Sequence, residues 1–494
     1  MSLSQATLLV LILYAIVTLV IVYRGAVKTK NIEDFTLGSG FSPVVVGLSL
    51  AASITSAATF IINPGFVALY GWSAFLAMSV VLPLALFLSL VVLSKSFRKY
   101  GTSQSALTMA QWIGNRYNSR TFSYFIVAVS LLLITFIVLI CVGITKVLGN
   151  ALGVSELLIL VILVVFVFGY TMFGGANSMV YTNTIQALLM IIVAVILLAS
   201  GSNYLTDGID AFWGKLATLD PKLVTSFNDS SPLFRDWFEV IFANFIVGIA
   251  IVCQPHIITK SLMLKSDKDV NKFLIVTILV ETLFFAVLFA GFYARLMFPD
   301  LTINGDSIKM DGILSAYVVR RFATGVGVIV VLGLLAAGLS TLEGLVQSLS
   351  ATITNDLIVP LKGWKGQTQK INNTNKIVIG LLAIITILVS YQQLLYPNLS
   401  VGILAQNGVY AYFSMAFVPV LFGIFFKNTP KQAAFGAAIT ALIVHFTVYY
   451  GALTPYTTGS VKNPAVAAAL AIIAAVLTGT ILYQIYKKKQ KYLN

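Results

Sequence analysis

Long apolar segments recur from one end of this 494-residue chain to the other, and they constrain its fold more than any other feature. A helix needs roughly 20 mostly apolar residues to cross the hydrocarbon core of a bilayer. Residues 6–23, 44–69, 76–93 and 122–148 each meet this length. Only 10% of the residues are charged, against about a quarter in soluble domains. The pattern predicts an all-α integral membrane protein.

Read along the whole chain, the hydropathy pattern predicts about thirteen transmembrane helices. These expected spans are 5–23, 43–70, 72–94, 121–149, 155–173, 179–202, 236–260, 272–298, 323–357, 376–395, 399–426, 431–451 and 464–486. The stretches 203–235 and 299–322 are expected outside the membrane. Because no linker or soluble domain interrupts the spans, we expect residues 1–494 to form a single membrane transporter domain.

The positive charge is distributed in a way typical of membrane proteins. The net charge is +14, but the basic residues fall in alternate loops instead of forming one face, which argues against nucleic-acid binding. Lys260 is counted in one of these basic loops, and the C-terminal tail carries four lysines between 487 and 491. Positively charged loops stay in the cytoplasm. The pattern therefore predicts a multi-pass protein of the plasma (inner) membrane, with its N-terminus outside and its C-terminus cytoplasmic.

Two of the expected spans are rich in polar side chains. The second and the ninth contain Ser53, Thr55, Ser56, Thr59, Asn63-Pro64-Gly65, Ser340, Thr341, Glu343 and Gln347. Polar groups and broken backbone survive in a bilayer only where they face protein or a water-filled cavity. Hydroxyls and freed carbonyls suit a dehydrated sodium ion, whereas close helix packing through small residues is the alternative. The two spans together, with a Pro-Gly break in one, favour an ion site.

Three of the ionisable residues within the expected spans are candidates for a function. A carboxylate such as Glu343 is unfavourable inside a bilayer unless it is paired or functional, and Glu281 is a second, weaker case. His256 either titrates or caps a broken helix. The polar residues form isolated clusters, which argues against the continuous lining of a channel. No nucleotide-binding motif is present, so an ATP-driven pump is not expected. We do not expect the chain to be an enzyme.

Several short motifs carry a family resemblance. They are Asp34-Phe35-Thr36-Leu37-Gly38, Gly174-Gly175 followed by Val180-Tyr181-Thr182-Asn183-Thr184-Ile185-Gln186, and the stretch from Ser350 to Leu357. In this order and spacing the chain resembles the sodium:solute symporter family, which includes sodium/proline, sodium/galactose, sialic acid and pantothenate transporters. The resemblance implies a LeuT-like core of two inverted five-helix repeats. These would be 43–202 and 236–426, with an extra N-terminal helix at 5–23 and two C-terminal helices and a cytoplasmic tail in 431–494.

The resemblance also implies where sodium binds. The main sodium site falls on Ala52, Thr55, Ala337, Ser340 and Thr341. The chain departs from the family pattern at two positions: Asn183 stands where many relatives have Asp, and Glu343 stands where relatives with a second sodium site have Ser. We hypothesise that the negative charge has moved and that Asn183 and Glu343 hold a second cation.

The solute is less constrained than the ion. Phe136 falls where sialic acid transporters have an Arg, and no basic residue is expected in mid-membrane. The Pro255-His256 pair and the lysines after it resemble the pantothenate and monocarboxylate branch. We expect sodium-coupled import of a small organic solute by alternating access, with a small carboxylate first and a neutral polar solute such as a sugar or proline second. A proton-coupled symporter or a channel is less favoured, and no obligate protein partner is expected. The substrate-binding residues predicted are Ser56, Thr59, Phe75, Met78, Phe136, Asn244, Gln406, Asn407 and Tyr410.

Overall fold

The protein is described by a computed structural model that covers residues 3–38, 40–364, 366–396, 401–426 and 428–493. It is almost entirely helical, which confirms the predicted class. The long helices are α1 (Leu3–Lys28), α6 (Leu82–Ser103), α9 (Ile134–Leu152), α10 (Glu156–Ala199), α14 (Val270–Ala286), α17 (Thr324–Thr352), α19 (Thr368–Leu395), α20 (Val401–Phe425), α21 (Lys431–Tyr450) and α22 (Pro464–Leu493).

Shorter elements join or extend these helices. They are α2 (Ile32–Thr36), α3 (Pro43–Ile54), α4 (Asn63–Tyr70), α5 (Trp72–Phe75), α7 (Met109–Arg116), α8 (Arg120–Ser130), α11 (Ile209–Leu219), α12 (Asn244–Ile251), α13 (Pro255–Ile258), α15 (Ala290–Met297), α16 (Ile313–Arg321) and α18 (Val359–Lys362). One small antiparallel hairpin pairs β1 (Thr302–Ile303) with β2 (Asp306–Ser307).

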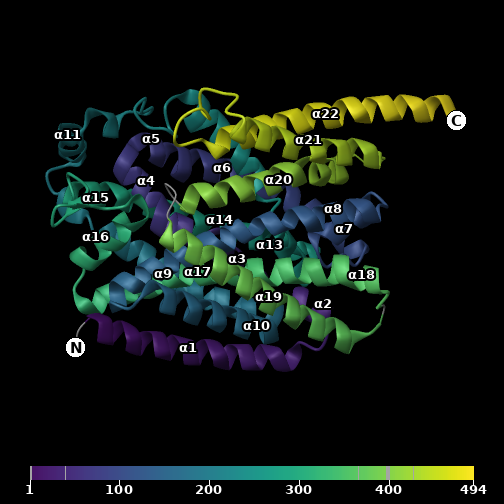
Figure 1. The fold of residues 1–494 in the computed structure, drawn as a ribbon, viewed down its shortest axis with the longest axis horizontal. Coiled ribbons are helices and arrows are strands. Elements are labelled where there is room, and N and C mark those ends of the chain that lie inside the picture. Colours follow the sequence, from purple (N-terminus) through teal and green to yellow (C-terminus); the bar gives the residue numbers. More distant parts are fainter. Residues whose placement is uncertain (1–2, 39, 365, 397–400, 427, 494) are drawn as a thin grey trace.

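The helices form one elongated bundle (Figure 1). The helix α1 runs along one flank, and α21 and α22 run along the opposite flank. The most apolar window of α17 is 78% buried and that of α1 only 22%, so α17 belongs to the interior and α1 faces the surroundings. In the described part of the chain, ten helices are long and apolar enough to cross a membrane, or twelve with two bent pairs. The expected count of thirteen stays a prediction.

The first bent pair is α3 and the π-helical turn 58–62 that leads into α4, and it bends by 56°. The backbone of Thr55 is extended, with φ −80° and ψ 101°, and the Ser56 hydroxyl accepts from the amide of Ala58 at 3.1 Å. The break therefore lies at Thr55 and Ser56, and the expected Pro-Gly break at Pro64 is wrong. Proline is tolerated in the first turn of a helix, because its missing N–H would be unpaired there in any case.

The second bent pair joins α12 to α13 and the 3₁₀ turn 259–263, with a bend of 58°. Gln254 is extended, with φ −74° and ψ 137°, and Pro255 opens α13. Both breaks free backbone groups in the interior of the bundle, where a functional site can use them.

The helix α10 is a third interrupted element. Its 44 residues would extend about 66 Å if straight, more than twice the hydrocarbon core. Gly175 interrupts it with φ 53° and ψ −151°, at the uncharged stretch between two expected spans. A Cβ at Gly175 would lie 2.7 Å from the carbonyl oxygen of Phe35, so this position needs glycine for both conformation and space.

Candidate functional site

The middle of α17 lies against the carbonyls that end α3. The Ser340 hydroxyl donates to Ala52 O at 2.6 Å and lies 3.1 Å from Ala337 O in its own helix. All three residues are fully buried. The broken helix thus presents a carbonyl oxygen to a hydroxyl on a neighbouring helix, away from water.

The next residue of α17 contacts the same end of α3. Thr341 Oγ1 lies 3.1 Å from Ser53 O, 3.5 Å from Thr55 O and 3.4 Å from Ala337 O. The structure therefore brings together the five residues expected at the main sodium site. It adds the Ser53 carbonyl, which the sequence could not single out because any residue beside a break can offer its backbone oxygen.

We call the carbonyls of Ala52, Thr55 and Ala337 and the hydroxyls of Ser340 and Thr341 the oxygen cluster. A hydroxyl keeps lone pairs and can turn its hydrogen away, so all five groups can act as acceptors. Neutral oxygen atoms are the ligands that hard cations accept. Because all five residues are 0% exposed, a cation held there would be dehydrated. The cluster can bind a small monovalent cation.

The carboxylate of Glu281 lies next to the oxygen cluster and contacts the side chain of Thr55. The Thr55 hydroxyl donates to Glu281 Oε2 at 2.7 Å, and Glu281 on α14 is fully buried. Its other carboxylate oxygen has no hydrogen-bond partner among the described residues. Glu281 can therefore contribute negative charge near the cluster without being a ligand itself.

Glu343, the carboxylate of α17, is held by three neutral donors. The Tyr170 hydroxyl donates to Oε1, Thr182 Oγ1 donates to Oε2 at 2.6 Å, and Gln186 Nε2 donates to Oε1 at 3.0 Å. All three donors come from α10. Only 1% of Glu343 is exposed, so this carboxylate is well hydrogen-bonded but removed from solvent.

Asn183 belongs to the same network but reaches Glu343 through Gln186. Its amide is satisfied at both ends when its nitrogen donates to Gln186 Oε1 at 3.0 Å and its oxygen accepts from Lys260 Nζ at 3.2 Å and Ser53 Oγ at 2.9 Å. The two residues expected to hold a second cation are thus linked by one intervening amide.

The position of Lys260 corrects the sequence analysis. We expected a loop lysine and no basic residue in mid-membrane, but Lys260 is only 1% exposed. Its ammonium donates to Ser49 O at 3.1 Å and to Ser49 Oγ at 2.6 Å. The reason is the bend after α12, which turns the following residues back into the bundle.

A cavity of about 110 Å³ lies between the two helix breaks, and we call it the solute cavity. Five predicted substrate residues line it: Ser56, Thr59, Phe136, Gln406 and Tyr410. Three more polar residues line it that were not predicted to bind the substrate: Asn63, Gln254 and His256. Gln254 lies in the second break and His256 directly after it, and that break was the signal that could have pointed to them.

The other four predicted substrate residues lie outside this cavity: Phe75, Met78, Asn244 and Asn407. Asn244 donates to Glu239 O at 2.8 Å, and Asn407 donates to the Tyr450 hydroxyl at 3.0 Å. Asn407 therefore lies off the face that Gln406 and Tyr410 present to the solute cavity. Neighbouring helical residues point about 100° apart, which turns Asn407 toward α21.

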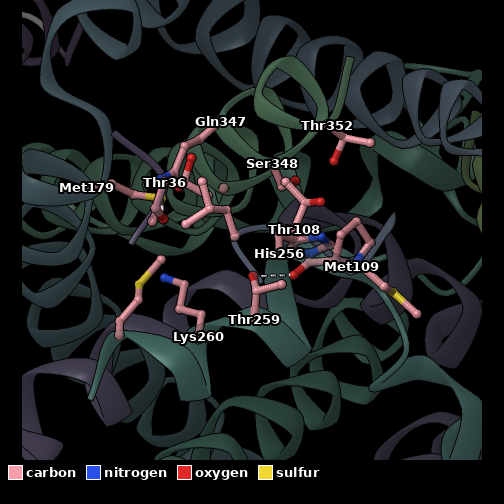
Figure 2. Close-up of a pocket in the computed structure, with 14 residues that line it drawn as sticks. Thr36, Thr108, Met109, Met179, His256, Thr259, Lys260, Gln347, Ser348 and Thr352 are labelled. Atoms are coloured by element: carbon pink, nitrogen blue, oxygen red, sulfur yellow. Dashed lines mark hydrogen bonds between the residues drawn. The ribbon is translucent and has the colours of Figure 1, made fainter. Parts of the chain in front are cut away.

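A second cavity also borders α13, and Pro255 and His256 are among the residues that line it (Figure 2). Lys260, Met179, Gln347 and Ser348 are among the residues that line it. His256 lines both this second cavity and the solute cavity. Neither of its ring nitrogens has a partner among the described residues, so its side chain does not cap the broken helix. The imidazole is instead part of the wall between the two cavities.

Two broken helices beside a dehydrated oxygen cluster, with a cavity between the breaks, define a secondary transporter of the discontinuous-helix class. Comparisons with known proteins agree. Residues 35–441 match the sodium:solute symporter family. The chain belongs to this family, and it is a multi-pass, sodium-coupled solute symporter with a LeuT-like fold.

Two relatives and one solved structure illustrate the match. The sodium/pantothenate symporter of Escherichia coli (strain K12) is 28% identical over 426 residues, which is 84% of each chain. The sodium/proline symporter 2 of Staphylococcus saprophyticus is 26% identical over 458 residues, 89% of this chain and 85% of that one. A substrate-bound, outward-open Na⁺-coupled sialic acid symporter superposes with a TM-score of 0.78 at 19% identity, covering 97% of this chain and 98% of its own.

Proposed function

We propose that this protein imports a small organic carboxylate together with sodium, which binds at the oxygen cluster. The observation that carries the proposal is a set of unpartnered polar atoms in the wall of the solute cavity. Gln254 Oε1 and both ring nitrogens of His256 are buried without a partner among the described residues. Buried polar atoms are normally hydrogen-bonded, so we expect a bound solute to supply hydrogen-bond partners for these atoms.

The chemistry of the wall limits what that solute can be. Gln254 Oε1 needs a hydrogen-bond donor, and a neutral imidazole offers one donor and one acceptor. Much of the remaining wall is apolar and includes Phe136, Leu139 and Phe413. A solute with a short hydrocarbon body, a hydroxyl or amide donor and an acidic acceptor matches this wall. Pantothenate has these groups, and a sodium/pantothenate symporter is among the relatives.

A net-neutral solute such as proline is the second candidate. No lysine or arginine is among the described residues that line the solute cavity. This favours a solute whose carboxylate is balanced by its own charge, and a sodium/proline symporter is among the relatives.

The organisation of transport follows from the same proposal. Two inverted repeats, 43–202 and 236–426, would move around the solute cavity to expose it to each side in turn. The N-terminus would lie outside and the C-terminus in the cytoplasm, as the charge pattern predicts. His256 would belong to the barrier that such a movement opens.

Uptake into proteoliposomes tests the function. A panel of labelled pantothenate, short monocarboxylates, proline and sugars is offered with and without an inward sodium gradient. We expect accumulation of a carboxylate only with sodium, and Gln254→Leu should weaken solute binding while sodium still raises the melting temperature. Sodium-independent uptake, or a Gln254→Leu variant with unchanged solute affinity, would contradict the proposal.

A further inference from the structure

A buried ammonium group lies where the sequence suggested a second cation. Lys260 Nζ is surrounded by three oxygens: Ser49 O at 3.1 Å, Ser49 Oγ at 2.6 Å and the amide oxygen of Asn183 at 3.2 Å. An ammonium has three hydrogens to donate, so this set satisfies it completely. Asn183 therefore already has a cation beside it, and that cation is part of the chain.

The ammonium is connected to Glu343 by a chain of side-chain amides. Asn183 accepts from Lys260 and donates to Gln186 Oε1 at 3.0 Å, and Gln186 donates to Glu343 Oε1 at 3.0 Å. We call these two amides the relay. In each of them the oxygen points toward the Lys260 ammonium and the nitrogen toward the Glu343 carboxylate. The partners come from α3, α10, α17 and the turn after α13.

Ser53 connects the relay to the oxygen cluster. Ser53 uses its hydroxyl toward Asn183 at 2.9 Å and its carbonyl toward Thr341 at 3.1 Å. The two places for positive charge are therefore neighbours. A sodium ion added between Asn183 and Glu343 would meet the Lys260 ammonium in a water-excluded region, where like charges repel strongly.

The buried charges of this region balance with one sodium ion. When Glu281 and Glu343 are ionised and Lys260 is protonated, they supply two negative charges and one positive charge, and all three residues are at most 1% exposed. His256 has no described acid within hydrogen-bond reach and is counted as neutral. Before a solute binds, one sodium at the oxygen cluster makes the sum zero, whereas two would leave an uncompensated positive charge, which is unfavourable in a buried site.

We infer that the Lys260 ammonium is the resident second cation of this transporter, so that one sodium ion accompanies each solute. The inference rests on the proposed sodium site and goes beyond it, because it fixes the stoichiometry. It replaces the hypothesis that Asn183 and Glu343 bind a second sodium ion.

The first test is the ratio of transported sodium to solute in proteoliposomes with the full-length protein, together with the sodium dependence of its melting temperature in detergent. For the natural sequence we expect a ratio of about one and a Hill coefficient of about 1. A ratio of two overturns the inference and leaves the proposed function intact. The absence of any sodium response contradicts the proposed function itself.

Variants separate a resident cation from a structural lysine. Lys260→Met should admit a sodium ion in place of the ammonium and raise the Hill coefficient toward about 2, whereas the exposed Lys268→Met should leave it near 1. The double variant Lys260→Met with Glu343→Gln removes both charges and should return the coefficient to about 1. A folded Lys260→Met variant with an unchanged coefficient overturns the inference. If Lys260→Met does not fold, the double variant becomes the test: a folded double variant with a Hill coefficient of about 1 supports the inference. If the double variant does not fold either, the sodium-to-solute ratio of the natural protein decides whether the inference stands.

Discussion

Replacing Ser340 by alanine is the most direct perturbation of the oxygen cluster. The change deletes one oxygen that lies 2.6 Å from Ala52 O and 3.1 Å from Ala337 O, and leaves the α17 backbone free to keep its path. Because the residue is fully buried, water does not readily replace the lost oxygen. The two carbonyls remain, so the site loses one ligand of five and is not abolished.

The expected magnitude follows from the loss of one buried polar partner. Such a loss is worth about 1–3 kcal/mol, and about 1.4 kcal/mol corresponds to a tenfold change in affinity. We therefore expect Ser340→Ala to raise the sodium concentration for half-maximal uptake by about five- to 150-fold. Thr341→Ala should act in the same direction, because it removes the oxygen that faces Ser53 and Thr55.

The assay is uptake of labelled solute into proteoliposomes at graded external sodium, with ionic strength held constant by choline. Ser350→Ala is a matched control on the same helix, because Ser350 is equally buried and donates to Gln347 O of its own helix at 3.1 Å. The control should keep the natural sodium dependence. An unchanged sodium dependence in a folded double variant of Ser340 and Thr341 would refute the assignment of the oxygen cluster as the sodium site.

Three further outcomes are expected. Replacing external sodium by potassium or choline should abolish uptake, and full transport driven by a proton gradient alone would refute sodium coupling. Glu281→Gln removes a buried carboxylate beside Thr55 and should raise the sodium concentration that gives half-maximal thermal stabilisation roughly tenfold. An unchanged sodium concentration would make Glu281 purely structural. Gly291→Ala places a Cβ 2.2 Å from Pro64 O and should lower stability by about 1–3 kcal/mol, whereas Gly380→Ala, with nothing within 4 Å, should have little effect on the melting temperature.

The class of the fold and the main cluster could be predicted because strong physical constraints act on single residues. A bilayer excludes exposed polar groups, so Ser340 and Thr341 in an apolar span drew attention by themselves. The family resemblance then supplied the partners Ala52 and Thr55, whose contribution is backbone oxygen. No side-chain pattern identifies such atoms, and for the same reason the sequence analysis missed the Ser53 carbonyl.

The positions of the breaks and of Lys260 could not be read in the same way. Pro64 suggested a break, but proline also fits the first turn of a helix, and the actual break at Thr55 and Ser56 has no proline. Lys260 looked like a loop residue because charge counting assumes straight spans. The bend after α12 turns it inward, and only three-dimensional structure shows a partner such as Asn183.

The helix α1 lies at the edge of the bundle, yet one of its side chains reaches the centre. The Tyr14 hydroxyl accepts from Gln186 Nε2 at 2.7 Å, and the same nitrogen donates to Glu343. Removal of α1 would therefore take away one of the two acceptors of this amide nitrogen, not only cover from the outer surface of the bundle. The helix α1 is thus a direct participant in the buried polar network around Glu343, although it lies at the edge of the fold.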